Sequence, residues 1–275
     1  MDWIQAIVLG VVEGVTEYLP VSSTGHLILA QRALGIGQGE AADAFAICIQ
    51  AGAIAAVLGL YFPRVRQMVW GLLGRDPEGL RLAGNVVAAF LPAVVLGLLL
   101  EKRIKVHLFN LPAITVAWFV GGIAILAVVS WRRRTVSPTR PGRELPDLTV
   151  AGALLIGLAQ CAAMWPGTSR SLMTIVGGLL VGLQVSAAVE FSFLLGLLTL
   201  SAATAHDALK HGAALLGAYS ASSMALGFAA AALAAAVSVK WMVGYLRSHS
   251  LAVFGWYRVG LAALVAVFLF LGVRG

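Results

Sequence analysis

Long apolar runs separated by short polar segments dominate this chain. The runs of about 19 to 24 residues have the length that an α-helix needs to cross a hydrocarbon core of about 30 Å. The pattern therefore predicts an all-α polytopic membrane protein with six transmembrane helices. The predicted spans are residues 44–62, 82–100, 111–131, 187–205, 215–238 and 251–272.

Two further apolar regions, residues 4–35 and 149–183, are each interrupted near the middle by a polar stretch. The interrupting stretches are YLPVSSTGH and MWPGTSRS. The apolar pieces beside them are about 14 to 16 residues long, which is too short to span the membrane comfortably. Irregular backbone at membrane depth is tolerated only where protein buries it or where it lines a wet cavity. We therefore predict two re-entrant helical hairpins.

The two interrupted regions resemble each other. Aligned with one offset, Pro20 matches Pro166 and Ser23 matches Ser169, and Phe45 matches Phe191 in the span that follows. Three spans follow each hairpin, and because three is odd, the second copy is expected to be inverted relative to the first. The expected organisation is one integral membrane domain, 1–275, with a first inverted repeat at 1–135 and a second at 146–275.

Composition and charge support this interpretation and suggest an orientation. Hydrophobic residues make up 60% of the chain and charged residues 11%, whereas about a quarter of a soluble domain is charged. The net charge of +7 comes from basic residues in short loops, which favours membrane topology over nucleic-acid binding. More of these residues lie on the side opposite the N-terminus, where the run WRRRTVSPTR (131–140) is typical of a cytoplasmic anchor to anionic lipid. Both termini are therefore expected outside.

The first polar interruption follows two carboxylates. Glu13 and Glu17 are four residues apart and share one face of a helix. A carboxylate inside the membrane is costly and indicates a functional site. The pair is a candidate ligand set for a divalent cation, Mg²⁺ or Ca²⁺, and the sequence does not decide between the two metals.

Hydroxyl groups and an imidazole follow the carboxylates. Pro20 ends the first short helix, and Ser22, Ser23 and Thr24 open the next one, with Ser22 or Ser23 as its candidate N-cap. His26 lies one turn beyond Ser23. The free N–H groups and the dipole at a helix N-terminus favour an anion.

The second interruption supplies the complementary groups. Thr168 and Ser169 begin another short helix, with Arg170 beside them. A guanidinium binds phosphate oxygens in a bidentate manner, so the two interruptions together predict a phosphate site. The further residues expected to bind or support phosphate are Ser22, Thr24, Gln160, Ser171 and Thr174.

At these residues the chain resembles a known family. The stretches GVVEGVTEYLPVSSTGH (10–26) and PGTSRS (166–171) are similar to the motifs of the undecaprenyl-diphosphate phosphatase family, also called the bacitracin-resistance family. FAICIQAGAIAAV (45–57), EFSFLL (190–195) and YRVG (257–260) also resemble segments of that family, so the similarity runs nearly end to end.

The resemblance implies an enzyme of the bacterial plasma (inner) membrane that removes the terminal phosphate from an isoprenyl diphosphate lipid and so recycles the lipid carrier of cell-wall synthesis. It also implies a divalent metal and an active site open to the outer, periplasmic face. By motif match, the acidic pair of the family falls on Glu13 and Glu17, its catalytic serine on Ser23, its histidine on His26 and its arginine on Arg170. Many relatives have glycine after the second serine of PGTSRS, whereas here that residue is a leucine.

Several alternatives stay open at this point. The nucleophile is Ser23, His26 or a water activated by the metal, and either Glu17 or His26 would accept a proton from Ser23. Broken helices in an inverted repeat also describe secondary transporters of anions, so a carrier or flippase of a lipid phosphate is the second functional hypothesis. Glu190 and Arg258 are expected to pair with each other or with Gln50. The oligomeric state, a homodimer included, is not fixed.

Overall fold

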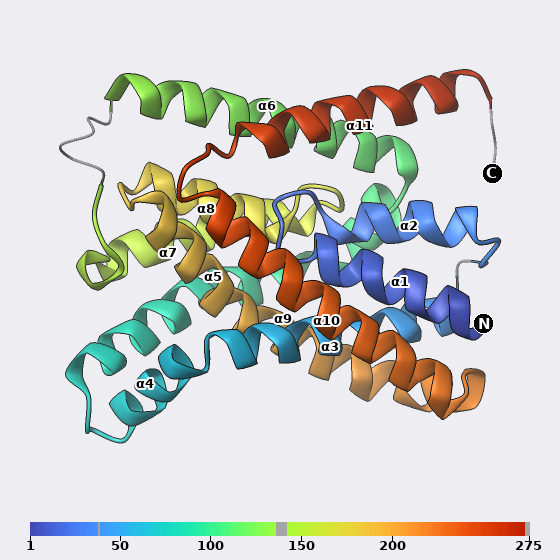
Figure 1. Cartoon of the computed structure of the whole chain (residues 1–275), viewed down its shortest axis with the longest axis horizontal. Helices are drawn as coiled ribbons and strands as arrows, with labels where there is room; N and C mark the ends of the chain where they lie inside the picture. The colour runs from blue at the N-terminus through green and yellow to red at the C-terminus, as the bar shows by residue number, and fades with distance from the viewer. Residues whose placement is uncertain (38, 136–141, 273–275) are drawn as a thin grey trace.

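The structure is a computed structural model that describes residues 1–37, 39–135 and 142–272 (Figure 1). Part of the predicted cytoplasmic anchor lies outside the described residues. The described ranges are helical, with one isolated bridge between Arg143 and Leu183 and no longer strand within those ranges. The helices are α1 (Trp3–Thr16), α2 (Ser23–Ala33), α3 (Glu40–Leu60), α4 (Phe62–Leu72), α5 (Pro77–Leu108), α6 (Leu111–Thr135), η1 (Leu145–Asp147), α7 (Val150–Cys161), η2 (Ala162–Met164), α8 (Arg170–Leu180), α9 (Val185–Ala218), α10 (Ala221–Tyr245) and α11 (Ala252–Phe270).

Long apolar helices confirm that the chain is a multi-pass membrane protein. Within the described residues, α5, α6, α9, α10 and α11 each contain a stretch long and apolar enough to cross a bilayer. α3 and α4 meet that condition only as a pair, and the pair is bent by 78°. The predicted span 44–62 is therefore the greater part of α3 followed by a sharp bend.

The predicted span 215–238 is wrong at its beginning. The described backbone continues as α9 to Ala218, and α10 begins only at Ala221 and extends to Tyr245. Ser220 caps α10, because its hydroxyl accepts a hydrogen bond from the backbone N–H of Ser223 at 3.2 Å. Ser220, Ser222 and Ser223 mark this boundary in the sequence, and the predicted span wrongly ran through them.

The helices beside the two interruptions form two pairs, α1 with α2 and α7 with α8. The pairs approach each other from opposite ends of the molecule. In Figure 1, α1 and α2 occupy the end at which the chain begins, and α7 lies toward the opposite end. α1 packs on α10, and α7 packs on α5. Glycines allow both approaches: a Cβ at Gly10 would collide with the carbonyl oxygen of Gly227, and one at Gly157 with that of Ala89.

Apolar packing surrounds the place where the pairs meet. Tyr18 and Leu19, which follow α1, belong to one buried cluster with Leu172 of α8 and Phe193 of α9. The rings of Tyr18 and Phe193 pack edge to face with centroids 5.5 Å apart. Polar groups placed here therefore need partners within the protein.

The pairing expected for Glu190 is wrong. Glu190 accepts a hydrogen bond from Arg64 Nε at 2.6 Å, and Gln50 accepts one from Thr204 at 2.8 Å. A straight span over 44–62 would have carried Arg64 away from the bundle, whereas the bend between α3 and α4 leaves it within reach of α9.

Candidate active site

The predicted site residues lie in or close to two breaks between short helices. We define the first break as residues 17–22, between α1 and α2, and the second break as residues 162–169, between α7 and α8. Ser22 has φ 73° and ψ 101°, and Ser169 has φ 77° and ψ 119°. No other non-glycine residue in the described ranges has positive φ. Strained backbone of this kind clusters at functional sites.

The matched backbone corrects the register inferred from the sequence. Ser22, not Ser23, corresponds to Ser169, because each is the last residue before a helix and each has the same unusual conformation. The helices then begin at Ser23 and Arg170. The sequence alignment matched Pro20 with Pro166 and so shifted the serines by one position. The second break has one more residue between its proline and the helix that follows.

Capping differs between the two breaks. Ser169 Oγ accepts a hydrogen bond from Leu172 N at 3.3 Å and so caps α8. Ser22 occupies the cap position of α2 but makes no side-chain cap bond. The predicted capping of α2 by Ser22 or Ser23 is therefore wrong, and the Ser23 hydroxyl points to Glu17 instead.

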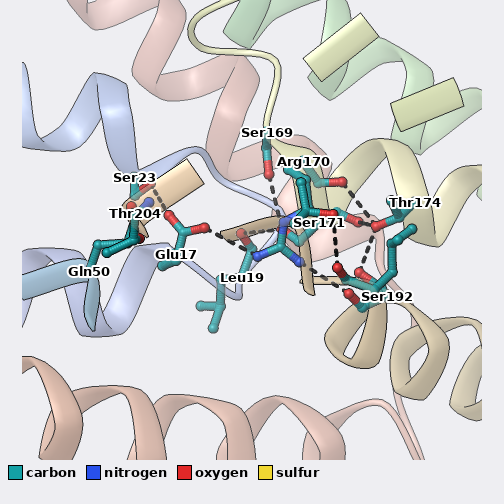
Figure 2. A network of polar contacts seen from close by, with 12 residues as sticks. Glu17, Leu19, Ser23, Gln50, Ser169, Arg170, Ser171, Thr174, Ser192 and Thr204 are labelled. Atoms are coloured by element: carbon teal, nitrogen blue, oxygen red, sulfur yellow. Dashed lines mark hydrogen bonds and ion pairs between the residues drawn. The ribbon is translucent and has the colours of Figure 1, made fainter. Parts of the chain in front are cut away.

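A chain of polar contacts joins the two breaks (Figure 2). Ser23 Oγ donates a hydrogen bond to Glu17 Oε2, and Arg170 Nη2 binds the other oxygen of the same carboxylate at 3.2 Å. Arg170 Nη1 donates to the backbone carbonyl of Ser192 in α9 at 3.1 Å. The carboxylate thus lies between a hydroxyl that can lose a proton and a guanidinium, and exposure of the Glu17 and Arg170 side chains is 7% and 10%.

Side chains from other helices hold the backbone of the first break. The carbonyl of Leu19 accepts from Ser171 Oγ at 2.9 Å, and that of Val21 accepts from Trp118 Nε1 at 3.0 Å. The carbonyl of Pro20 between them accepts from Arg258 Nη1 at 3.3 Å. These three successive carbonyls are therefore satisfied within the protein, as irregular backbone at membrane depth requires.

His26 is held at both ring nitrogens. Nδ1 lies 2.7 Å from the carbonyl oxygen of Ser22, which can only accept, so Nδ1 carries a proton. Nε2 lies 2.7 Å from the hydroxyl of Tyr257, and the two rings are nearly parallel. In a neutral ring, Nε2 therefore accepts from Tyr257. Neither nitrogen contacts Ser23 within the described residues, so the geometry favours Glu17 over His26 as the group beside the Ser23 hydroxyl.

Four buried polar atoms of the candidate site lack partners in the described part of the chain: Glu13 Oε2, Arg170 Nε, Tyr18 Oη and Gln160 Nε2. The first two belong to charged groups. Glu13 is 2% exposed, and its Oε2 has no hydrogen-bond partner in the described part of the chain. Arg170 Nε is likewise buried without a partner. Buried groups of this kind are rare and point to a missing ligand. Glu13 Oε2 can accept from a donor or bind a cation, and Arg170 Nε can donate to an anion.

The metal expected from the sequence would have few protein ligands. No cluster of three or more His, Cys, Asp or Glu residues that could hold a metal is found in the described ranges. Mg²⁺ is commonly bound by one or two carboxylates together with substrate phosphates and water. The unpartnered oxygen of Glu13, one turn before Glu17, fits such a site.

The remaining predicted residues divide into two groups. Ser171 and Thr174 use their hydroxyls inside the protein: Ser171 also contacts Ser169 Oγ at 3.0 Å, and Thr174 Oγ1 lies 2.6 Å from Ser192 Oγ. Gln160 accepts from Thr199 at 3.3 Å and has no contact with the Glu17–Arg170 pair among the described residues. Thr24 and Thr168 form the second group: both are half-buried, and neither hydroxyl has a hydrogen-bond partner in the described part of the chain.

Four residues of the site were not assigned from the sequence. They are Tyr18, whose ring lies 5.3 Å below the Arg170 guanidinium, and Ser192, Tyr257 and Arg258. Ser192 and Arg258 carry a signal, because each is a polar residue within an apolar helix. The contact of Tyr257 with His26 depends on how α11 lies across the first break.

Comparisons with known proteins agree along nearly the whole chain. An undecaprenyl-diphosphatase of Sorangium cellulosum is 49% identical over 270 residues, covering 96% of this chain and 86% of the relative. Undecaprenyl-diphosphatase 2 of Rhodospirillum rubrum is 46% identical, covering 95% and 93%, and undecaprenyl-diphosphatase 1 of Paraburkholderia xenovorans is 42% identical, covering 96% and 95%. The family model described as bacitracin resistance protein BacA matches residues 6–264, and this chain therefore belongs to the BacA family.

Proposed function

We propose that this chain is a membrane phosphatase that hydrolyses undecaprenyl diphosphate to undecaprenyl phosphate and inorganic phosphate. The observation that carries the proposal is the buried chain from Ser23 through Glu17 to Arg170, which joins a nucleophile, a base and a phosphate-binding cation. The relatives named undecaprenyl-diphosphatase support the substrate. The product is the lipid carrier that cell-wall synthesis uses again.

In the proposed first step, Ser23 Oγ attacks the terminal phosphorus. Its proton passes to Glu17 Oε2, with which it already shares a hydrogen bond. The bond from the terminal phosphorus to the bridging oxygen breaks, and the electron pair leaves with undecaprenyl phosphate. Water then attacks the phosphoserine, the bond from phosphorus to Ser23 Oγ breaks, and Glu17 returns its proton to that oxygen. Inorganic phosphate leaves, the second proton of the water passes to solvent, and Ser23 and Glu17 are restored. The sequence left water and His26 open as nucleophiles, and the contact of Ser23 with Glu17 favours the serine.

Phosphate would be bound by groups from both breaks. Arg170 Nε has no protein partner and would donate to a phosphate oxygen. The half-buried hydroxyls of Thr24 and Thr168 would add hydrogen bonds, while Ser171 and Thr174 fix the backbone and Arg170. His26, once protonated at Nε2, would donate from that nitrogen to the phosphate that leaves with the lipid, in place of its contact with Tyr257. Phosphoryl transfer depends mainly on such positioning and charge stabilisation.

A divalent cation, Mg²⁺ or Ca²⁺, belongs to the proposal. Glu13 would hold it through the oxygen that has no partner, with Glu17 beside it. When bound, the cation would neutralise negative charge on the phosphate oxygens. The same carboxylate of Glu17 keeps its contacts with Ser23 and Arg170.

The finer topology is also a proposal. We infer that the two breaks belong to re-entrant hairpins of an inverted repeat, because α1 packs on α10 of the other half as α7 packs on α5. The matched conformations of Ser22 and Ser169 support the same conclusion. The excess of basic residues opposite the N-terminus favours both termini outside and a site open to the outer face.

Phosphate release from the purified protein tests the proposal against the transporter alternative. In detergent, with Mg²⁺ or Ca²⁺, the protein should release inorganic phosphate from undecaprenyl diphosphate, and Glu17→Gln should not. A transporter needs two compartments and would release none. Absence of release in detergent, together with movement of the lipid between leaflets of vesicles, would replace the phosphatase with the transporter.

A further inference from the structure

Arg258 connects α11 to both breaks. Its side chain is fully buried. Nη1 donates to the carbonyl of Pro20 at 3.3 Å in the first break, and Nη2 donates to the carbonyl of Gly167 at 2.9 Å in the second. The same guanidinium donates to the carbonyls of Trp118 at 3.3 Å and Ala117 at 2.9 Å in α6.

This arginine has no carboxylate partner in the described part of the chain. Burying an unpaired cation costs several kcal/mol even after relaxation. Here four backbone carbonyls take the place of a counter-ion, and they accept charge-assisted hydrogen bonds. Lysine could not reproduce this arrangement, because its ammonium is a compact point charge, whereas the planar guanidinium reaches acceptors on three sides.

The two carbonyls in the breaks lie close to the reacting groups in sequence. Pro20 lies between Glu17 and Ser23, and Gly167 lies three residues before Arg170. We infer that Arg258 is a positioning residue for the proposed hydrolysis. It holds the two breaks at the separation at which Arg170 meets Glu17, and Glu17 meets Ser23. The inference rests on the proposed function.

The space for the guanidinium is made by a glycine of α6. A Cβ at Gly121 would collide with Arg258 Nη2 and would lie 2.8 Å from Cζ. Gly121→Ala therefore displaces the guanidinium without removing its charge. A glycine in α5 offers a matched control, since a Cβ at Gly84 would meet nothing within 4 Å.

The test compares Arg258→Met, Arg258→Lys and Gly121→Ala with two controls, Arg64→Lys and Gly84→Ala. Arg64 is a partly exposed arginine that pairs with Glu190 outside the breaks. A misplacement of about 1 Å at a reacting centre costs about 100-fold in rate. We expect Arg258→Met to lower kcat by about that factor with KM little changed, Arg258→Lys and Gly121→Ala to lie between it and the wild type, and both controls to match the wild type.

Hydrogen–deuterium exchange gives a second readout that does not need activity. Peptides that contain the first break and the second break should both exchange faster in Arg258→Met and Gly121→Ala, and in neither control. If the wild type released no phosphate but both breaks loosened together, the proposed function would fail while the link between the breaks stood. Unchanged kcat in folded Arg258→Met, or faster exchange spread evenly over the chain, would overturn the positioning role.

Discussion

Most polar groups of the candidate site are satisfied inside the protein, and the two unsatisfied atoms that belong to charged side chains have opposite character. Glu13 Oε2 is an acceptor without a donor, and Arg170 Nε is a donor without an acceptor. A phosphate with a bound cation would satisfy both atoms at once. The proposed function therefore gives the acidic pair two roles: Glu13 would hold the cation, and Glu17 would accept the proton of Ser23.

These roles predict different responses to metal. In Glu13→Gln, the Mg²⁺ or Ca²⁺ concentration that gives half-maximal activity should rise by about tenfold or more, because one carboxylate ligand is lost. Excess metal should restore much of the turnover. In Glu17→Gln, turnover should stay low at every metal concentration. The exposed Glu78→Gln is the control. A metal response of Glu13→Gln identical to the wild type would contradict the assignment.

Arg170 should not tolerate its conservative replacement. The guanidinium binds Glu17 and the carbonyl of Ser192 and keeps Nε for the substrate. Lysine has no planar fork, so Arg170→Lys should lower kcat/KM by about 100-fold or more. Steady-state kinetics with undecaprenyl diphosphate measure this, and turnover equal to the wild type would remove Arg170 from the phosphate site.

At the residue scale, the sequence indicated candidate site residues where polar side chains interrupt an apolar run. Glu17, Ser23 and Arg170 could be predicted because each sits at an interruption of an apolar run, where a polar residue is conspicuous. The contacts of Arg258 and Tyr257 could not. They depend on how α11 crosses the breaks, and that crossing follows from packing between distant segments.

At the scale of elements, the short helices are positioned by close packing of small residues. α7 approaches α5 at Gly157, where a Cβ would collide with the carbonyl oxygen of Ala89 and lie 2.8 Å from its carbon. Because the obstacle is backbone, it cannot move aside as a flexible side chain would. The contact fixes the depth at which the second break lies.

Gly157→Ala should therefore destabilise the protein. Overpacking of this kind costs about 1 to 3 kcal/mol, and thermal unfolding in detergent should show a lower Tm. Gly97→Ala in α5 is the matched control, since a Cβ there meets nothing within 4 Å. A Tm of Gly157→Ala at or above that of the control would show that the two helices are not in close contact.

The hydropathy pattern did not predict where two of the helices end. The apolar pattern predicted helices at each of the observed spans, yet it missed the bend between α3 and α4 and the boundary at Ser220. Each feature has a polar or proline mark in the sequence: Pro63 and Arg64 follow the bend, and Ser220 begins a serine cluster at the boundary. A hydropathy average over a long window does not resolve such short marks.

At the scale of the whole molecule, the two breaks approach one another from opposite ends. If the N-terminal end is outside, Gly37 before α3 faces out and Arg134 at the end of α6 faces the cytoplasm; both are exposed. In a variant with Cys48 and Cys161 replaced by serine, an impermeant thiol reagent applied to intact cells should label Gly37→Cys and leave Arg134→Cys unlabelled. The reverse labelling would invert the orientation and place the candidate site on the other face.

The central claim is that Ser23, activated by Glu17, attacks the terminal phosphate. The most direct measurement is the turnover of Ser23→Ala and Ser22→Ala, purified in the same way and compared with the wild type on undecaprenyl diphosphate. Ser23 donates to Glu17, whereas the Ser22 side chain makes no cap bond. Ser23→Ala should fall to background while still binding the lipid, and Ser22→Ala should keep measurable turnover. Equal and mild losses in the two variants would contradict the serine mechanism and point to attack by water or by His26.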